Sequence, residues 1–333
     1  MRTTPVTTGT SAGRGRRIRL VAGTLVAALG IGASPSVAGT LVPCGCTIND
    51  PPITYARQVA DEGGVEVFTM SAKGTGQTRV TNSPGFDGMP SYSPDRSRIV
   101  YATTRHSTPS SLNYELHVID ANGANDRRLT DHPAVDWEPA WSPTSDKIAF
   151  ASDRDGNSEI YVVNADGTGL QNLTKSPGSD RQPAWSPDGK RIVFVRPSTQ
   201  TLRKLFIMNA DGSGLHQLIT ANEAAEENPA WSADGSTIAF SQLVGITADR
   251  EIHVVKTDGS NIRRVTNRAG DDDKPTWSPD GRIAYAASSP DSVLRSDIRV
   301  IRPDGTGDAP LTTNEDWEGM PAWGRIPPPV TQR

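Results

Sequence analysis

Short runs of apolar residues separated by turns are the main pattern along this chain. Within residues 183–220 the pattern predicts strands at 183–186, 191–195, 205–208 and 215–219, joined by turns rich in Pro, Asp and Gly. The second and third strands are almost continuously apolar, whereas a sheet with one wet face would alternate apolar and polar residues. Both faces of this sheet are therefore expected to be covered by other parts of the chain.

The fourth strand of each unit is different, because it carries polar residues or proline. Examples are Arg127-Arg128, Gln171-Asn172, Arg263-Arg264 and Pro310. Charged side chains and a missing N–H donor protect an exposed sheet edge from pairing with another chain. The fourth strand is therefore expected to form the outer edge of each sheet.

The four-strand unit is repeated. The phrase Pro-Ala-Trp-Ser, or a close copy of it, begins at Pro90, Pro139, Pro183, Pro229, Pro275 and Pro321, at spacings of 49, 44, 46, 46 and 46 residues. A second marker, an apolar residue followed closely by threonine, ends each unit at Thr81, Thr130, Thr174, Thr220, Thr266 and Thr312. Both markers occur six times, and a period of this length is typical of propeller blades.

We therefore predict an all-β fold, a six-bladed β-propeller whose blades are four-stranded and antiparallel. The first unit, from about residue 53 to Thr81, lacks the proline phrase before it, and the last phrase, Pro321 to Trp323, has no later strands after it. Together these pieces make one blade. The C-terminal strand is expected to join blade one and close the ring.

The repeat resembles the WD-like propeller repeat of the TolB family. That pattern, Pro-x-Trp-Ser-Pro-Asp-Gly followed by an apolar strand, a strand ending in Asp-Gly and then Leu-Thr, is matched over about residues 53–323. The resemblance implies a periplasmic protein that binds partners of an envelope system. Only about a dozen residues separate Gly39 from the first strand, so the N-terminal domain of TolB is expected to be lacking and its partners do not carry over.

The N-terminus has the features of a signal peptide. Arginines at 14, 16, 17 and 19 precede an apolar run at residues 20–32, and Ser36-Val37-Ala38 offers a cleavage site. The predicted organisation is a signal peptide at 1–38, a flexible Pro/Gly/Cys segment at 39–52, the propeller at 53–324 and a Pro-rich tail at 325–333. An uncleaved anchor, export by the twin-arginine route and a lipid on Cys44 are the alternatives left open.

Charge excludes one class of partner. The chain has 34 Lys and Arg against 38 Asp and Glu, a net charge of −4. Cleavage after Ala38 removes five arginines and no acid, which lowers the net charge to −9. No nucleic-acid partner is expected, because a protein with this negative charge would repel phosphate groups. We also expect a monomer with no stable membrane span after cleavage.

One acidic position recurs three residues before every proline of the repeat. The six residues are Asp87, Asp136, Asp180, Glu226, Asp272 and Glu318. They fall between the outer strand of one blade and the inner strand of the next, and are expected to gather at one mouth of the channel. They form either a site for a divalent cation or a basic partner, or an architectural feature that every blade needs. The second interpretation is favoured, because all six blades share the residue.

Other candidate chemistry is sparse. Trp137 and Trp317 lie beside the acidic position and are candidate loop aromatics for stacking on a sugar or peptide, whereas the five repeat tryptophans are expected to pack between blades. The five histidines share no metal-ligand spacing, and no hydrolase motif occurs. No catalytic residue and no cofactor is assigned.

The favoured function is therefore a secreted, periplasmic or wall-associated scaffold that binds a protein, peptide or envelope glycan. The alternative is a carbohydrate-active lyase or hydrolase with its site at the channel mouth.

Overall fold

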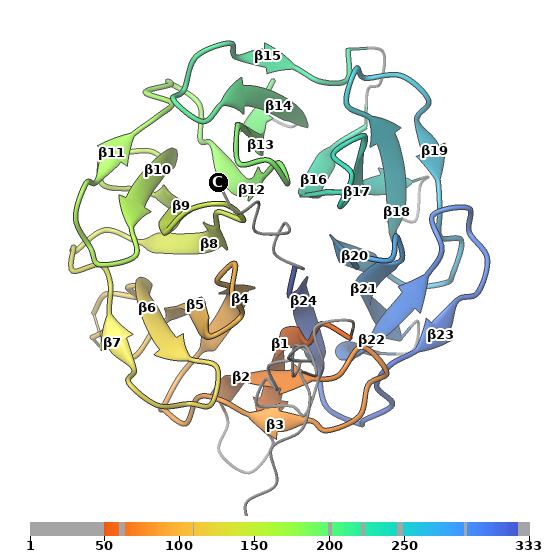
Figure 1. Ribbon diagram of the computed structural model, residues 1–333, viewed down its shortest axis with the longest axis horizontal. Coiled ribbons are helices and arrows are strands. Elements are labelled where there is room, and N and C mark those ends of the chain that lie inside the picture. The colour runs from red at the N-terminus through yellow and green to blue at the C-terminus, as the bar shows by residue number, and fades with distance from the viewer. Residues whose placement is uncertain are drawn as a thin grey trace, which may run out of the picture. The chain divides into compact units, whose positions relative to one another are not determined.

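The computed structural model describes residues 50–59, 64–108, 110–198, 202–220, 224–244, 249–289 and 292–325. All of them belong to the second of two structural units, Gly39–Arg333. These residues form strands and turns, and none of them is helical. Six four-stranded sheets stand around a common axis, as Figure 1 shows, and the predicted six-bladed propeller is confirmed.

Each blade consists of four antiparallel strands, with consecutive strands as neighbours in five of the six blades. From the innermost strand outwards, blade 1 contains β24 (Glu318–Trp323), β1 (Ile53–Val59), β2 (Gly64–Met70) and β3 (Thr78–Arg79); blade 2 contains β4 (Asp87–Tyr92), β5 (Arg98–Thr103), β6 (Glu115–Asp120) and β7 (Arg127–Arg128); blade 3 contains β8 (Asp136–Trp141), β9 (Lys147–Ser152), β10 (Glu159–Asn164) and β11 (Gln171–Asn172); blade 4 contains β12 (Arg181–Trp185), β13 (Arg191–Pro197), β14 (Arg203–Asn209) and β15 (His216–Gln217); blade 5 contains β16 (Glu226–Trp231), β17 (Thr237–Val244), β18 (Asp249–Lys256) and β19 (Arg263–Arg264); and blade 6 contains β20 (Asp272–Trp277), β21 (Ile283–Ser289), β22 (Ser292–Ile301) and β23 (Ala309–Pro310).

The apolar middle strands build the interfaces between blades. Six clusters of buried side chains occur, and each combines residues of two adjacent blades, so that every one of the six interfaces has its own core. Each cluster contains one inner-strand aromatic residue, namely Tyr92, Trp141, Trp185, Trp231, Trp277 or Trp323. The prediction that the repeat tryptophans pack between blades is therefore confirmed. The continuous apolar runs are explained by blades that cover both faces of their neighbours.

Every inner strand contains a β-bulge in the same place. In blade 2 the register passes from Gly88↔Ala102 to Ser91↔Val100, so that Met89 and Pro90 lie opposite the single residue Tyr101. The same shift occurs in the other five blades. The residue before each proline has a left-handed backbone, with φ between 52° and 56°. Proline suits this strand because no further strand pairs with its channel-side edge.

The ring is closed by strands from the two ends of the propeller sequence. β24 pairs antiparallel with β1, with Ile53 opposite Trp323 and Thr54 opposite Ala322. The indole N–H of Trp323 donates to the carbonyl oxygen of Pro51 at 3.0 Å, and the N–H of Gly324 donates to that of Pro52 at 2.8 Å. The predicted closure by the C-terminal strand is confirmed.

The predicted signal peptide at 1–38, most of the 39–52 segment with Cys44 and Cys46, and the tail from 326 onward lie outside the described residues. Within the described part of the chain, no helix has the length and hydrophobicity needed to cross a membrane.

Closure predicts a strong effect of truncation. Deleting residues 314–333 removes β24 and Trp323, which leaves blade 1 without its inner strand and opens the apolar interface between blades 6 and 1. Loss of a buried Trp side chain alone costs about 3–5 kcal/mol. We expect a large fall in melting temperature, measured by circular dichroism, for the mature chain. Deleting only residues 326–333 is the control and is expected to leave melting unchanged. Equal melting of the two truncations would contradict closure by β24.

Candidate functional site

The structure buries all six carboxylic acids of the repeat. Each stands at or directly before the first residue of an inner strand, and each has 0–1% of its surface exposed. None of the six lines the pocket on the propeller axis. No group of three or more His, Cys, Asp or Glu among the described residues is arranged to hold a metal ion. Whether these acids bind a ligand stays a prediction.

Four of the six acids form ion pairs with an arginine of their own blade. The N–O distances are 3.1 Å for Arg105 and Asp87, 2.8 Å for Arg154 and Asp136, 2.6 Å for Arg196 and Asp180, and 3.7 Å for Arg57 and Glu318. Each arginine lies at or just beyond the end of the blade's second strand, opposite the start of the inner strand. A buried carboxylate requires such a partner, because leaving it unpaired costs several kcal/mol.

The recurring threonine belongs to the same structural system. In blade 2, the hydroxyl of Thr130 donates to Glu115 at 2.6 Å and accepts the backbone N–H of Leu116 at 3.0 Å. Equivalent hydrogen bonds, which we call the Thr–Glu clasp, join Thr81 to Glu66 at 2.5 Å and Thr266 to Glu251 at 2.6 Å. The threonine therefore links the connection after the outer strand to the third strand of each of these blades.

Blade 4 replaces this clasp with a different pair. Its third strand carries Lys204 where blade 2 has Glu115, and the carboxylate comes from Glu226 of the next blade. The ammonium of Lys204 lies 3.1 Å from Glu226, whose other oxygen accepts the N–H of Leu205 at 2.9 Å. Glu226 thus pairs across the blade boundary, whereas the acids of blades 1 to 4 pair within their own blade.

Asp272 in blade 6 has no arginine of this kind. Neither of its carboxyl oxygens has a hydrogen-bond partner among the described residues, although the side chain is buried. Burial, reinforced by the negative charge of Glu251, raises the pKa of Asp272 to about 7. This carboxyl is therefore the member of the six that titrates near neutral pH.

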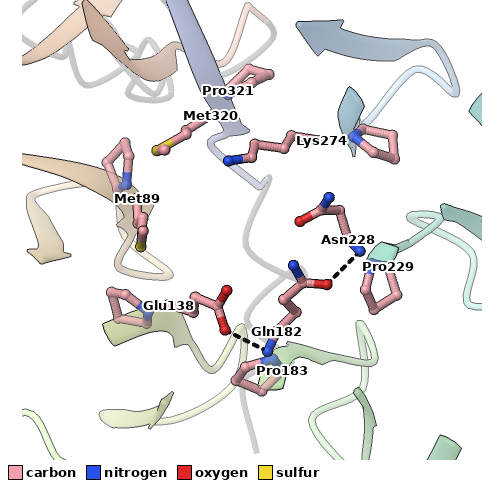
Figure 2. Close-up of a pocket in the computed structure, with 12 residues that line it drawn as sticks. Met89, Glu138, Gln182, Pro183, Asn228, Pro229, Lys274, Met320 and Pro321 are labelled. Atoms are coloured by element: carbon pink, nitrogen blue, oxygen red, sulfur yellow. Dashed lines mark hydrogen bonds between the residues drawn. The ribbon is translucent and has the colours of Figure 1, made fainter. Parts of the chain in front are cut away.

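The left-handed bulge residues, and not the acids, line the axis. A pocket of about 180 Å³ is lined by the six prolines and by Met89, Glu138, Gln182, Asn228, Lys274 and Met320. Figure 2 shows these six side chains, one from each blade, around the axis. On the far side of the prolines, Arg325 donates to the carbonyl oxygen of Trp185 at 3.3 Å. The side chain of Arg325 therefore extends from the end of blade 1 across the axis to blade 4.

Hydrogen bonds between blades hold part of this ring in place. The backbone N–H of Gln182 donates to a carboxylate oxygen of Glu138 at 2.8 Å, and that of Asn228 donates to the side-chain oxygen of Gln182 at 2.7 Å. The side-chain nitrogen of Asn228 donates to Asp273 at 2.8 Å. Because the bulges of blades 4 and 5 direct a backbone N–H toward the preceding blade, the geometry of the pocket is coupled to that of these bulges.

A larger pocket of about 480 Å³ adjoins the axial pocket and shares Glu138 and Gln182 with it. It lies on the face that carries the blade-to-blade connections and the hairpins between second and third strands, which we call the connection face. Arg181, Arg203 and Arg250 line this arginine pocket, together with Glu227. Glu227 forms ion pairs with Arg203 and, at 3.1 Å, with Arg250.

The two candidate loop aromatics are not brought together. Trp137 follows the acid of blade 3, is half-buried, and carries the guanidinium of Arg181 at 4.6 Å from its ring centre. Trp317 precedes the acid of blade 1, and its ring covers Gly319, where an added Cβ would lie 2.6 Å from the ring. Trp137 therefore supports the arginine pocket, whereas the ring of Trp317 packs against its own strand.

A family model described as the TolB beta propeller domain matches residues 109–222 and 139–326. The chain belongs to the TolB β-propeller family. Comparison with the curated proteins found no match.

Solved structures share the TolB propeller fold. TolB from Acinetobacter baumannii is 18% identical with a TM-score of 0.71, over 83% of this chain and 67% of its own. A candidate TolB from Agrobacterium tumefaciens is 20% identical with a TM-score of 0.63, over 81% and 91%. A propeller from a nidogen/laminin complex is 8% identical with a TM-score of 0.65, over 83% and 99%. At these identities the likeness concerns the fold.

The bulge residues of this TolB-type propeller were not singled out from the sequence. Met, Glu, Gln, Asn and Lys have no chemistry in common, so their identity gives no signal. The available signal was positional, since each immediately precedes the repeated proline and thus lies beside the axis.

The pKa of Asp272 predicts how stability changes with pH. In the folded state the protonated form is favoured, so Asp272 contributes stability below about pH 4 that is lost as pH rises through 7. Replacing it by the neutral isostere, Asp272→Asn, is expected to stabilise the protein at pH 8 by up to about 4 kcal/mol and to change little at pH 4. Urea unfolding at the two pH values measures the difference.

The matched control is Asp136→Asn, at the equivalent position of blade 3. This change leaves Arg154 without its carboxylate and is expected to destabilise the protein at pH 8. Destabilisation by both variants would show that Asp272 is paired in the folded state and would contradict the raised pKa.

Proposed function

We propose that this chain is an exported binding protein that recognises a protein, peptide or envelope glycan through its connection face. Export is supported by residues 1–38, which have the basic, apolar and small-residue order of a signal peptide. Membership of the TolB propeller family is consistent with a binding scaffold. The observation that carries the proposal is the arginine pocket.

The arginine pocket places positive charge on an acidic protein. The chain has a net charge of −4, yet Arg181, Arg203 and Arg250 converge on one pocket. Glu227 pairs with Arg203 and Arg250, and Arg250 also lies 3.5 Å from Asp271, so among the described residues Arg181 is the arginine of this pocket that has no ion pair. A local positive site on a negative surface attracts an anionic group and orients its approach.

Arg181 is positioned to receive such a group. Its guanidinium lies over the ring of Trp137, and its Nε donates to the hydroxyl of Ser158 at 3.0 Å. The two terminal nitrogens make no hydrogen bond with any residue that the structure describes. A guanidinium held flat with its terminal nitrogens free suits bidentate contact with a carboxylate.

The ligand chemistry follows from these groups. The partner carries at least one acidic group, such as the Asp or Glu of a protein segment or the uronic acid of a glycan. Arg203 is 53% exposed at its side chain and borders the pocket, where it can meet a large ligand. A pocket of about 480 Å³ is within the range that holds several residues' worth of side-chain or sugar atoms.

Charge reversal tests this proposal. The mature chain, residues 39–333, would be immobilised and exposed to envelope extract and to a glycan array that includes acidic glycans. We expect capture by the unaltered chain, and a loss of tenfold or more in the amount bound by Arg203→Glu. Lys190→Glu is the matched control, because Lys190 is exposed in the turn that follows β12, at the strand's other end. Equal losses in both variants, or none in either, would contradict the proposal.

A further inference from the structure

The axial pocket has a distribution of charge that differs from the arginine pocket. Glu138 belongs to blade 3 and Lys274 to blade 6, and in a ring of six blades these two stand opposite each other. No ion pair joins them, so their charged atoms are more than 4.0 Å apart. The pocket therefore has an acidic pole and a basic pole with space between them, as Figure 2 shows.

Each pole has a charge that is directed into the pocket. One oxygen of Glu138 accepts the N–H of Gln182, and its other oxygen faces the axis. The ammonium of Lys274 forms no hydrogen bond or ion pair with any of the residues the structure describes, and Figure 2 shows it extending toward the axis. Burial raises the pKa of Glu138, and the positive charges of Arg181 and Lys274 act in the opposite direction.

The two arcs between the poles also differ. Gln182 and Asn228, from blades 4 and 5, form an amide arc, whereas Met320 and Met89, from blades 1 and 2, form an arc of thioether side chains. The amide nitrogen of Asn228 is held by Asp273, which directs its carbonyl oxygen toward the axis. One side of the pocket thus offers hydrogen bonds and the other an adaptable apolar surface.

The pocket's size limits the ligand. A volume of about 180 Å³ lies below the range of about 300–1,000 Å³ for pockets that hold drug-sized ligands. An oligosaccharide or a folded peptide segment does not fit within it. A molecule smaller than a typical drug does.

The left-handed bulges prepare this arrangement before any ligand arrives. The six lining residues have φ between 52° and 56°, a conformation that L-residues seldom adopt. The bulges direct one side chain from every blade toward the axis, and the bonds from Gln182 to Glu138 and from Asn228 to Gln182 hold three of them. Strained backbone that converges on a polar pocket is characteristic of ligand sites.

We propose that the axial pocket binds a small zwitterion, with its ammonium on Glu138, its carboxylate on Lys274 and its apolar part against Met89 and Met320. The chemical class is a free α-amino acid with a short side chain. A divalent cation would face the ammonium of Lys274 in the same ring, and a lone anion would face Glu138. A neutral solute would leave both charges desolvated and unpaired.

The proposal concerns the axial pocket alone and does not depend on a partner at the arginine pocket. Calorimetry on the mature chain, residues 39–333, would use the common L-amino acids at millimolar concentration, with alanine and valine as the first probes. We expect saturable binding by at least one of them. N-acetylation, which removes the ammonium, and amidation, which removes the carboxylate, should each weaken its binding tenfold or more.

Two variants test which residue binds which end of the amino acid. Glu138→Gln should weaken binding of the unmodified amino acid. In this variant N-acetylation should cause no further loss of affinity, whereas amidation should still weaken binding. Lys274→Met should also weaken binding of the unmodified amino acid, but here amidation should cause no further loss and N-acetylation should still weaken binding. Lys190→Met, remote from the pocket, is the control for loss of a lysine. The effect of Arg203→Glu on ligand capture tests the arginine pocket separately. The proposal for one pocket can therefore be contradicted without affecting the proposal for the other.

Several outcomes would overturn the proposal. These are no binding of any amino acid to the unaltered chain, equal binding of the parent and both blocked forms, or identical losses in the two variants for every probe. The comparison of blocked and unblocked probes uses the unaltered chain and remains decisive even if a variant fails to fold.

Discussion

The unpaired edge of the innermost strands is the constraint on which this structure depends. Six inner strands end their sheets beside one axis, where no further strand continues the pairing and only side chains of a neighbouring blade accept some of the N–H groups. Proline removes a donor from that edge, and the bulge before it turns a side chain toward the axis instead of along the sheet. The same local solution, repeated six times, both protects the ring's interior and lines a pocket. Fold and candidate site therefore arise from one backbone feature.

Buried charge is the second constraint, and it divides the repeated acids from the pocket residues. The acids lie two positions before the bulge, within the blades, where arginine or lysine compensates five of the six. The bulge residues repeat in position only and differ in chemistry in nearly every blade. Repetition of a residue type thus marks architecture here, whereas variation at a shared position marks the surface that can be selective.

Much of the fold could be predicted from the sequence, because the proline phrase and the threonine marker each report a structural need shared by all blades. The number of blades, the strand order and the pairing of Trp323 with the first strand follow from counting them. The pocket could not be predicted in this way. Glu138 and Lys274 are 136 residues apart, and nothing local indicates that they face each other or that both have left-handed backbones. Trp137 was singled out as a possible stacking surface, but its role beside Arg181 required the positions of both side chains.

The Lys204–Glu226 pair between blades 4 and 5, which replaces the Thr–Glu clasp, has a consequence for how such propellers evolve by repeat duplication. A ring of near-identical repeats suggests units that could be duplicated, deleted or transposed freely. Yet Lys204 and Glu226 lie in consecutive blades and form a matched pair across their boundary. Blade 5 placed after blade 1 would bring Glu226 toward Glu66, a second buried carboxylate with no lysine between them. This coupled pair makes blades 4 and 5 depend on each other, so their order within the ring is constrained.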